Sequence, residues 1–185
     1  NSWVKLMRKS EGPSISTPPQ AQLRLDPAET EFITLEQLEN PVVRFGASYW
    51  LSLRGTKCFP ARDLVNVRDV GSALSHMMLI KVIEGGADFE LRVVGDAIAR
   101  ALRVPVHKRR LGDIAGEAPL FAERNFKFYR SVVESRKPLA MRTYLGPASQ
   151  ELKYTHVEAL ILPLGSRDDL VDYLLAFASY VSRFV

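Results

Sequence analysis

The sequence contains very little cysteine, and this limits the chemistry open to the chain. Cys58 is the single cysteine among 185 residues, so no internal disulfide and no cysteine-rich zinc site can form. It lies between Lys57 and Phe59 with no histidine beside it, which favours an inert thiol over a catalytic nucleophile. A secreted protein without disulfides would have the same count, but we expect a reducing, cytoplasmic location.

Long apolar runs are also missing. The longest, near 159–164 and 173–177, have the length of β-strands. A membrane-spanning helix needs about 20 apolar residues. The first residues carry bases but no continuous apolar segment, so we expect neither a signal peptide nor contact with a membrane.

A strong excess of positive charge is absent from most of the chain. The net charge of +4 and the pI of about 9.3 first suggest a nucleic-acid partner. However, residues 1–25 carry four bases and one acid, which leaves 21 bases and 20 acids for the remainder. The body is therefore nearly neutral, and we do not expect nucleic acid as a partner.

The composition that is present is typical of a globular protein, with 46% hydrophobic and 25% charged residues. Residues 1–28 are rich in Ser, Pro, Gly and Gln, which predicts a flexible basic tail. Residues 29–56 are predicted to be an N-terminal helical segment, because Phe32, Leu35 and Leu38 recur at helical spacing. Residues 57–185 are expected to form the main domain.

The main domain alternates between strand and helix patterns in a recognisable order. Two apolar strands flank the turn Gly85–Asp88, and a short helix follows at Asp96–Leu102. A longer helix is predicted at Pro119–Arg136, followed by three strands between 139 and 184. This order predicts an α+β fold with a five-stranded antiparallel sheet, short covering helices and preceding N-terminal helices.

Three motifs in this order resemble the signature of a bacterial single-domain PAS family. The first is YW-x2-LRG followed by P-x-R, the second is F-x-x-R-x-x-G before a short helix, and the third is a strand that ends in LPL. The matching positions are Tyr49, Trp50, Leu53, Arg54, Gly55, Pro60 and Arg62, then Phe89, Arg92, Gly95, Asp96 and Ile98, then Glu158, Leu162, Pro163 and Leu164. The segment 64–67 and the loop 103–113 depart from the family pattern.

The resemblance implies a sensory domain in which the sheet and its covering helices enclose a small ligand, or which dimerises through helices before the first strand. It supplies no catalytic residues. Strand alternation then predicts which side chains line the cavity. These are Met78, Ile80, Leu91, Val93, Ile98, Phe126, Tyr129, Met141, Thr143, His156, Leu160 and Tyr173. The same spacing also describes an ordinary filled core, and Arg142 and Tyr144 fall on the opposite face.

Cofactor and metal chemistry receive little support from the sequence. His76, His107 and His156 do not form a metal-binding spacing, and no cysteine occupies the place that a flavin photosensor of this fold needs. His107 stands where a PAS protein can hold haem, but a solvated loop histidine is the simpler interpretation. We therefore expect no metal and no haem, and leave the cofactor unknown.

A basic loop offers one more candidate site. Arg103, Lys108, Arg109 and Arg110 are close together, without interleaved aromatic residues. A solvated surface is the simpler interpretation, and an anion site for a phosphate-bearing ligand or an acidic partner protein is the alternative.

The leading hypothesis is a non-enzymatic PAS sensor or adaptor that binds a small ligand or a signalling protein. We expect a homodimer whose signalling helix carries Tyr49, Trp50, Leu53 and Arg54. The alternative is a ligand-free protein-interaction scaffold, and an enzyme acting on small molecules is more remote.

Overall fold

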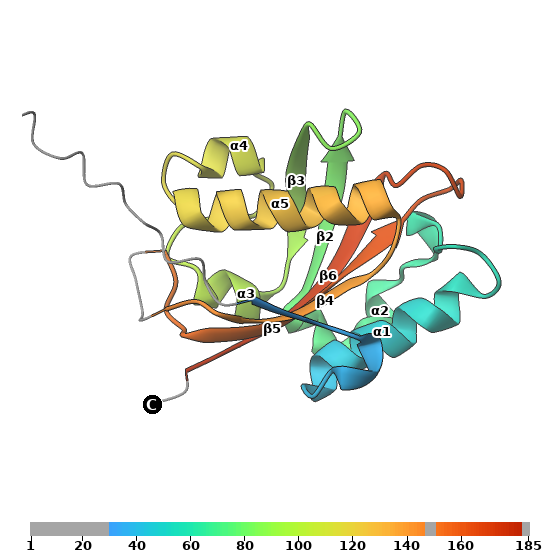
Figure 1. Ribbon diagram of the computed structural model, residues 1–185, viewed down its shortest axis with the longest axis horizontal. Coiled ribbons are helices and arrows are strands. Elements are labelled where there is room, and N and C mark those ends of the chain that lie inside the picture. The colour runs from blue at the N-terminus through green and yellow to red at the C-terminus, as the bar shows by residue number, and fades with distance from the viewer. Residues whose placement is uncertain (1–29, 147–150, 183–185) are drawn as a thin grey trace, which may run out of the picture.

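A single antiparallel sheet with helices on both faces forms the centre of the computed structural model, which describes residues 30–146 and 151–182 (Figure 1). The strand order is β1-β4-β5-β6-β2-β3. The strands are β1 (Thr30–Ile33), β2 (Met77–Ile83), β3 (Asp88–Val94), β4 (Leu139–Tyr144), β5 (His156–Leu164) and β6 (Tyr173–Val181). The predicted α+β class is confirmed, with six strands in place of five. The predicted tail, 1–28, lies outside the described residues.

The additional strand is β1, and the helix predicted around Phe32 is wrong. Residues Thr30–Ile33 pair with β4, with Thr30 opposite Thr143. The Phe32 ring lies 6.1 Å from that of Phe128 in an edge-on arrangement, on the face that the long helix covers. The next turn of chain forms only the short 3-10 helix η1 (Leu35–Gln37), in which the Gln37 side chain accepts the Thr34 N–H at 2.9 Å. The edge of β4 therefore decides the local structure, and helical spacing does not.

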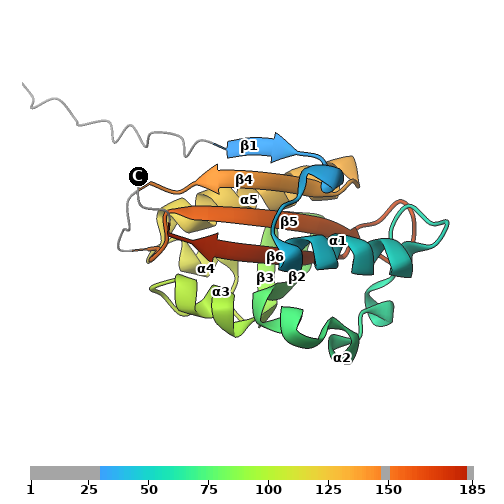
Figure 2. The same cartoon turned by 90° about the horizontal axis from the view of Figure 1, so that it is seen from below.

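Helix α1 (Pro41–Arg54) covers β5 and β6 on one face of the sheet (Figure 2). The Asn40 side chain accepts hydrogen bonds from the backbone N–H groups of Val42 and Val43, at 3.0 and 3.3 Å. Pro41 suits the first turn because its missing N–H has no partner to lose there. Gly55 ends the helix at φ 58°, a left-handed conformation that glycine adopts readily.

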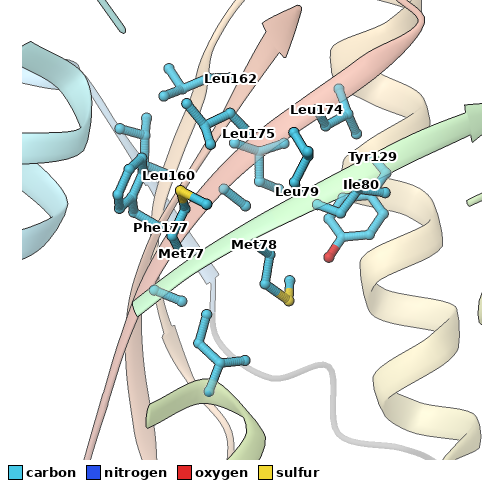
Figure 3. Close-up of a cluster of buried hydrophobic side chains, with 14 of the residues drawn as sticks. Met77, Met78, Leu79, Ile80, Tyr129, Leu160, Leu162, Leu174, Leu175 and Phe177 are labelled. Carbon is cyan, nitrogen blue, oxygen red and sulfur yellow. The ribbon is translucent and has the colours of Figure 1, made fainter. Parts of the chain in front are cut away.

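The opposite face of the sheet is covered by the long helix α5 (Pro119–Ser135) together with α3 and α4. The remaining short helices are η2 (Arg62–Leu64), α2 (Val67–Val70), η3 (Gly71–His76), α3 (Asp96–Ala101) and α4 (Leu111–Ile114). The Phe89 ring meets the rings of Phe126 and Tyr129 on α5, at 5.4 and 5.3 Å between centroids. Figure 3 shows Met77 and Phe177 toward the α1 side and Met78 and Tyr129 toward the α5 side.

The chain between α3 and α4 lies along the outer edge of β3. Leu91 donates its N–H to the Arg109 carbonyl at 2.9 Å, and the Lys108 N–H donates to the Leu91 carbonyl at 2.7 Å. Lys108 takes a left-handed conformation, at φ 58°, to make this turn. Among the described residues, no helix has the length and apolar character to cross a bilayer.

Candidate functional site

A small pocket lies between α5 and the sheet, on the face where the cavity was expected. Its volume is about 50 Å³, and most of its wall is apolar. The wall is made by Met78, Phe121, Arg124, Asn125, Phe128, Tyr129, Met141, Thr143, Leu145, Leu152, Val157, Ala159, Leu160, Ile161, Ala176, Phe177, Ala178 and Tyr180. The pocket thus joins one face of α5 to strands β2, β4, β5 and β6.

The most unusual group in this wall is the Tyr129 hydroxyl. The side chain is 1% exposed, and its oxygen has no hydrogen-bond partner among the described residues. A buried hydroxyl without a partner costs about 1–3 kcal/mol, so natural cores usually satisfy it. Burial raises the pKa of Tyr129, which keeps the phenol protonated and available as a donor.

Two further polar groups, Tyr180 and Arg124, belong to the same wall. Burial raises the pKa of Tyr180 to about 12, and the charge of Arg124 opposes this rise. Arg124 is half-buried, and it has no hydrogen bond or ion pair within the described part of the chain. Burial lowers the pKa of its guanidinium, while Tyr180 and Glu151 raise it.

Glu151 does not neutralise this guanidinium by direct contact. Its carboxylate accepts the N–H groups of Leu120 and Phe121 at the start of α5, at 3.2 and 2.9 Å. Such an acceptor suits the positive end of a helix. The carboxylate therefore holds α5 to the chain before β5, and Arg124 has no bonded anion among the described residues.

The structure gathers some of the predicted cavity residues at this pocket. Those that border it are Met78, Tyr129, Met141, Thr143 and Leu160. Ile80, Leu91 and Ile98 are completely buried in the surrounding core. Phe126 packs on Phe89 beside the pocket and does not border it.

Four predicted cavity positions lie on the wrong face, and one of them is Leu160, which borders the pocket but pairs with Phe177 on the α1 side. The pairing register shifts between Leu79 and Ile80, so Val93 pairs with Leu79. The Val93 side chain therefore lies on the opposite face of the sheet from Leu91, which pairs with Ile80. His156 pairs with Tyr144, which places both on the α1 side of the sheet. Tyr173 shares that side, where the Arg62 guanidinium lies 5.8 Å from the ring centroid.

The sequence interpretation missed Arg124, Asn125 and Tyr180. The face of α5 toward the pocket includes Arg124 and Phe128 together with Phe121 and Tyr129, so it is not purely apolar. The signal that could have found Arg124 is its spacing from the two aromatic residues, because Phe121 lies three residues before it and Phe128 four residues after it.

The predicted signalling residues hold α1 against its own sheet. The Trp50 side chain is 1% exposed, and its indole N–H donates to the Pro163 carbonyl at 2.9 Å. The Tyr49 hydroxyl accepts the Asn66 N–H at 2.9 Å, and the Arg54 guanidinium lies 5.5 Å from the Trp50 ring. Leu53 is half-buried beside them.

An open groove of about 650 Å³ lies on the α1 side of the sheet, beyond the start of that helix. Glu158 is part of its wall and accepts the Arg142 Nε–H at 3.0 Å and the Asn40 N–H at 2.7 Å. Arg142 also forms ion pairs with Glu39 and Glu31, at 3.2 and 3.9 Å. The hydrogen bond to Glu158 raises the pKa of Arg142. These contacts hold the segment before α1 to the sheet, which accounts for the predicted orientation of Arg142.

The basic loop is partly neutralised. Arg109 forms an ion pair with Glu117 at 2.6 Å and donates to the Pro105 carbonyl at 2.8 Å. Arg103, Lys108 and Arg110 are exposed. The loop therefore resembles a solvated surface more than a built anion site.

The three histidine side chains each have a different hydrogen-bond partner. His76 and His107 each bond a backbone carbonyl, and His156 bonds the Thr155 hydroxyl. No metal-binding cluster of acidic, histidine or cysteine side chains occurs in 30–146 and 151–182. Cys58 is exposed.

Comparison with known proteins gives one match. A family model described as "PAS domain" matches residues 40–177, well over half of the chain. None of the curated proteins and none of the solved structures matches it.

Proposed function

Because this chain belongs to the PAS domain family, we propose that it is a sensory protein without catalytic activity. It binds a small ligand in the pocket between α5 and the sheet, and it passes the change on through α1. Its place of action is the cytoplasm. Domains of this family are generally sensory and not catalytic, which supports the proposal.

The Tyr129 hydroxyl is the observation that carries the proposal. Its oxygen is buried, faces a pocket and has no partner among the described residues. A core that only has to be stable would bury phenylalanine here, because an unpaired hydroxyl is unfavourable. A ligand that accepts this hydrogen bond removes the penalty.

Strand β6 offers a route from the pocket to α1. Ala176 and Ala178 border the pocket, while Phe177 between them packs under Gly46 of α1. Side chains alternate across a strand, so a shift of this short segment moves both faces together. A ligand that displaces β6 would therefore change how α1 packs, which is the output that we propose.

Native mass spectrometry of the protein purified from its own host tests the ligand. We expect a stoichiometric small-molecule adduct on the wild-type chain. Ala176→Leu should abolish this adduct, because the larger side chain fills the pocket from β6. Ala99→Leu is the matched control, since Ala99 is exposed on α3.

A bare wild-type chain would contradict ligand binding. If it instead co-purifies with a protein, the alternative of a ligand-free scaffold is favoured. An adduct that Ala176→Leu retains would place the ligand elsewhere.

We further propose that the chain acts as a homodimer through α1. Phe45 and Leu51 of this helix are 38% and 42% exposed, which supports a partner on its outer side. We expect a dimer by light scattering, and Leu51→Glu should produce a monomer because it places a charge in the contact. Leu170→Glu, at an equally exposed position between β5 and β6, should leave the dimer intact. A monomeric wild type would remove the dimer from the proposal.

A further inference from the structure

The polar groups of the α5 pocket point to one class of ligand. We propose that the pocket binds a short-chain monocarboxylate, with its carboxylate toward Arg124 and the two tyrosines and its alkyl part against the apolar wall. This inference rests on the proposed function and specifies the ligand of that site.

Arg124 and Tyr129 are wall residues whose polar groups have no partner within 30–146 and 151–182, and both can donate; the Asn125 side chain, which donates to the Phe121 carbonyl at 2.8 Å, adds an amide acceptor. The Arg124 guanidinium can only donate, and a protonated phenol offers an O–H. Tyr129 and Tyr180 both stay protonated at neutral pH, since burial raises the pKa of each. Thr143 is already engaged, with its hydroxyl 3.1 Å from that of Thr30. The complement to this set is an acceptor with a negative charge.

The three donors belong to one site. The charge of Arg124 lowers the pKa of Tyr180, against the effect of burial. All three side chains border the same pocket. A half-buried guanidinium without an ion pair is unfavourable, and a carboxylate is the anion whose two oxygens match its planar donors.

The size of the pocket limits the remainder of the ligand. A volume of about 50 Å³, at about 10–15 Å³ for each water-sized site, leaves room for about three to five non-hydrogen atoms. Acetate and propionate, with about four and five non-hydrogen atoms, are in this range. Butyrate has one atom more, and the Met78 and Met141 side chains can adapt to a molecule of that size. Phosphate would fit by size, but its higher charge has one guanidinium to meet and it makes no use of the apolar wall.

Titration of the full chain with propionate, followed by ¹H–¹⁵N NMR, tests this assignment. Propionamide is the neutral probe of the same shape. We expect saturable shifts for residues around the pocket, with propionate bound about tenfold or more tightly than propionamide, as for a hydrogen bond to a charged group.

Two variants separate charge from packing. Arg124→Met should abolish the preference for propionate, because the thioether retains the length but not the charge. Arg130→Met is the matched control and should retain it, since Arg130 lies over the Phe126 ring outside the pocket. Tyr129→Phe should weaken propionate binding about tenfold without lowering the melting temperature of the free protein, because its hydroxyl has no partner to lose. A purely structural tyrosine would show the opposite pattern.

The outcomes distinguish this inference from the proposed function. Equal binding of propionate and propionamide, or an unchanged preference in Arg124→Met, would overturn the carboxylate and leave a ligand-binding pocket. No binding of either probe, together with an adduct in native mass spectrometry, would also overturn the carboxylate alone. No binding and no adduct would contradict both.

Discussion

Replacing Trp50 with alanine is expected to lower the free energy of unfolding by about 3–5 kcal/mol, the usual cost of truncating a buried aromatic residue. The side chain is 1% exposed between α1 and the sheet, so its removal leaves a cavity that the backbone cannot close. The Pro163 carbonyl also loses its indole donor. Urea unfolding followed by far-UV circular dichroism measures the effect without relying on tryptophan fluorescence.

Two comparisons make the Trp50 result specific. Trp50→Phe keeps most of the packing but loses the hydrogen bond, so we expect a smaller loss of about 1–2 kcal/mol. Ser48→Ala changes an exposed position of the same helix and should alter stability by less than about 0.5 kcal/mol. If Trp50→Ala were as stable as Ser48→Ala, α1 would not be held to the sheet in solution.

Gly46→Ala is expected to destabilise the protein, although glycine to alanine usually stabilises a helix by about 0.5–1 kcal/mol. An added Cβ at residue 46 would overlap the Phe177 ring, which is completely buried under α1. Either the ring or the helix must move, and overpacking of this kind costs about 1–3 kcal/mol. The same urea titration measures the loss.

The sign of the change at Gly46 is the critical result. Gly116→Ala is the control, because an added Cβ there meets open space and should be neutral or slightly stabilising. Phe177→Leu in the Gly46→Ala background should recover part of the lost stability, because a smaller side chain makes room for the Cβ. A stabilising Gly46→Ala would mean that α1 lies farther from β6.

Local sequence patterns were sufficient for the hairpin of β2 and β3. Gly85 and Gly86 both have positive φ, at 67° and 106°, which explains why the turn between β2 and β3 could be read directly. The predicted long helix likewise matches α5 closely. Both features depend on residues that are near one another in the chain.

Features that depend on distant partners could not be predicted. Strand β1 has only four residues, and its partner β4 lies more than a hundred residues away in the sequence. A long connection separates β4 from β5, so the sequence does not show which residues of β5 face α5. His156 was therefore predicted on the wrong face. Tyr180 was missed for the same reason, because only the pairing with Val157 shows that it faces α5.

The two outermost strands, β1 and β3, differ in whether their outer edge is hydrogen-bonded to other parts of the chain. This difference affects how two copies of the protein could associate. The outer edge of β3 is occupied by the loop that carries Lys108 and Arg109, since Leu91 exchanges both its N–H and its C=O with that loop. The other edge is β1, with four residues. An open strand edge is a template for adding a strand from another molecule. The basic loop thus occupies part of the β3 edge, and within the described residues the edge that is left for strand addition by a second copy is Thr30–Ile33.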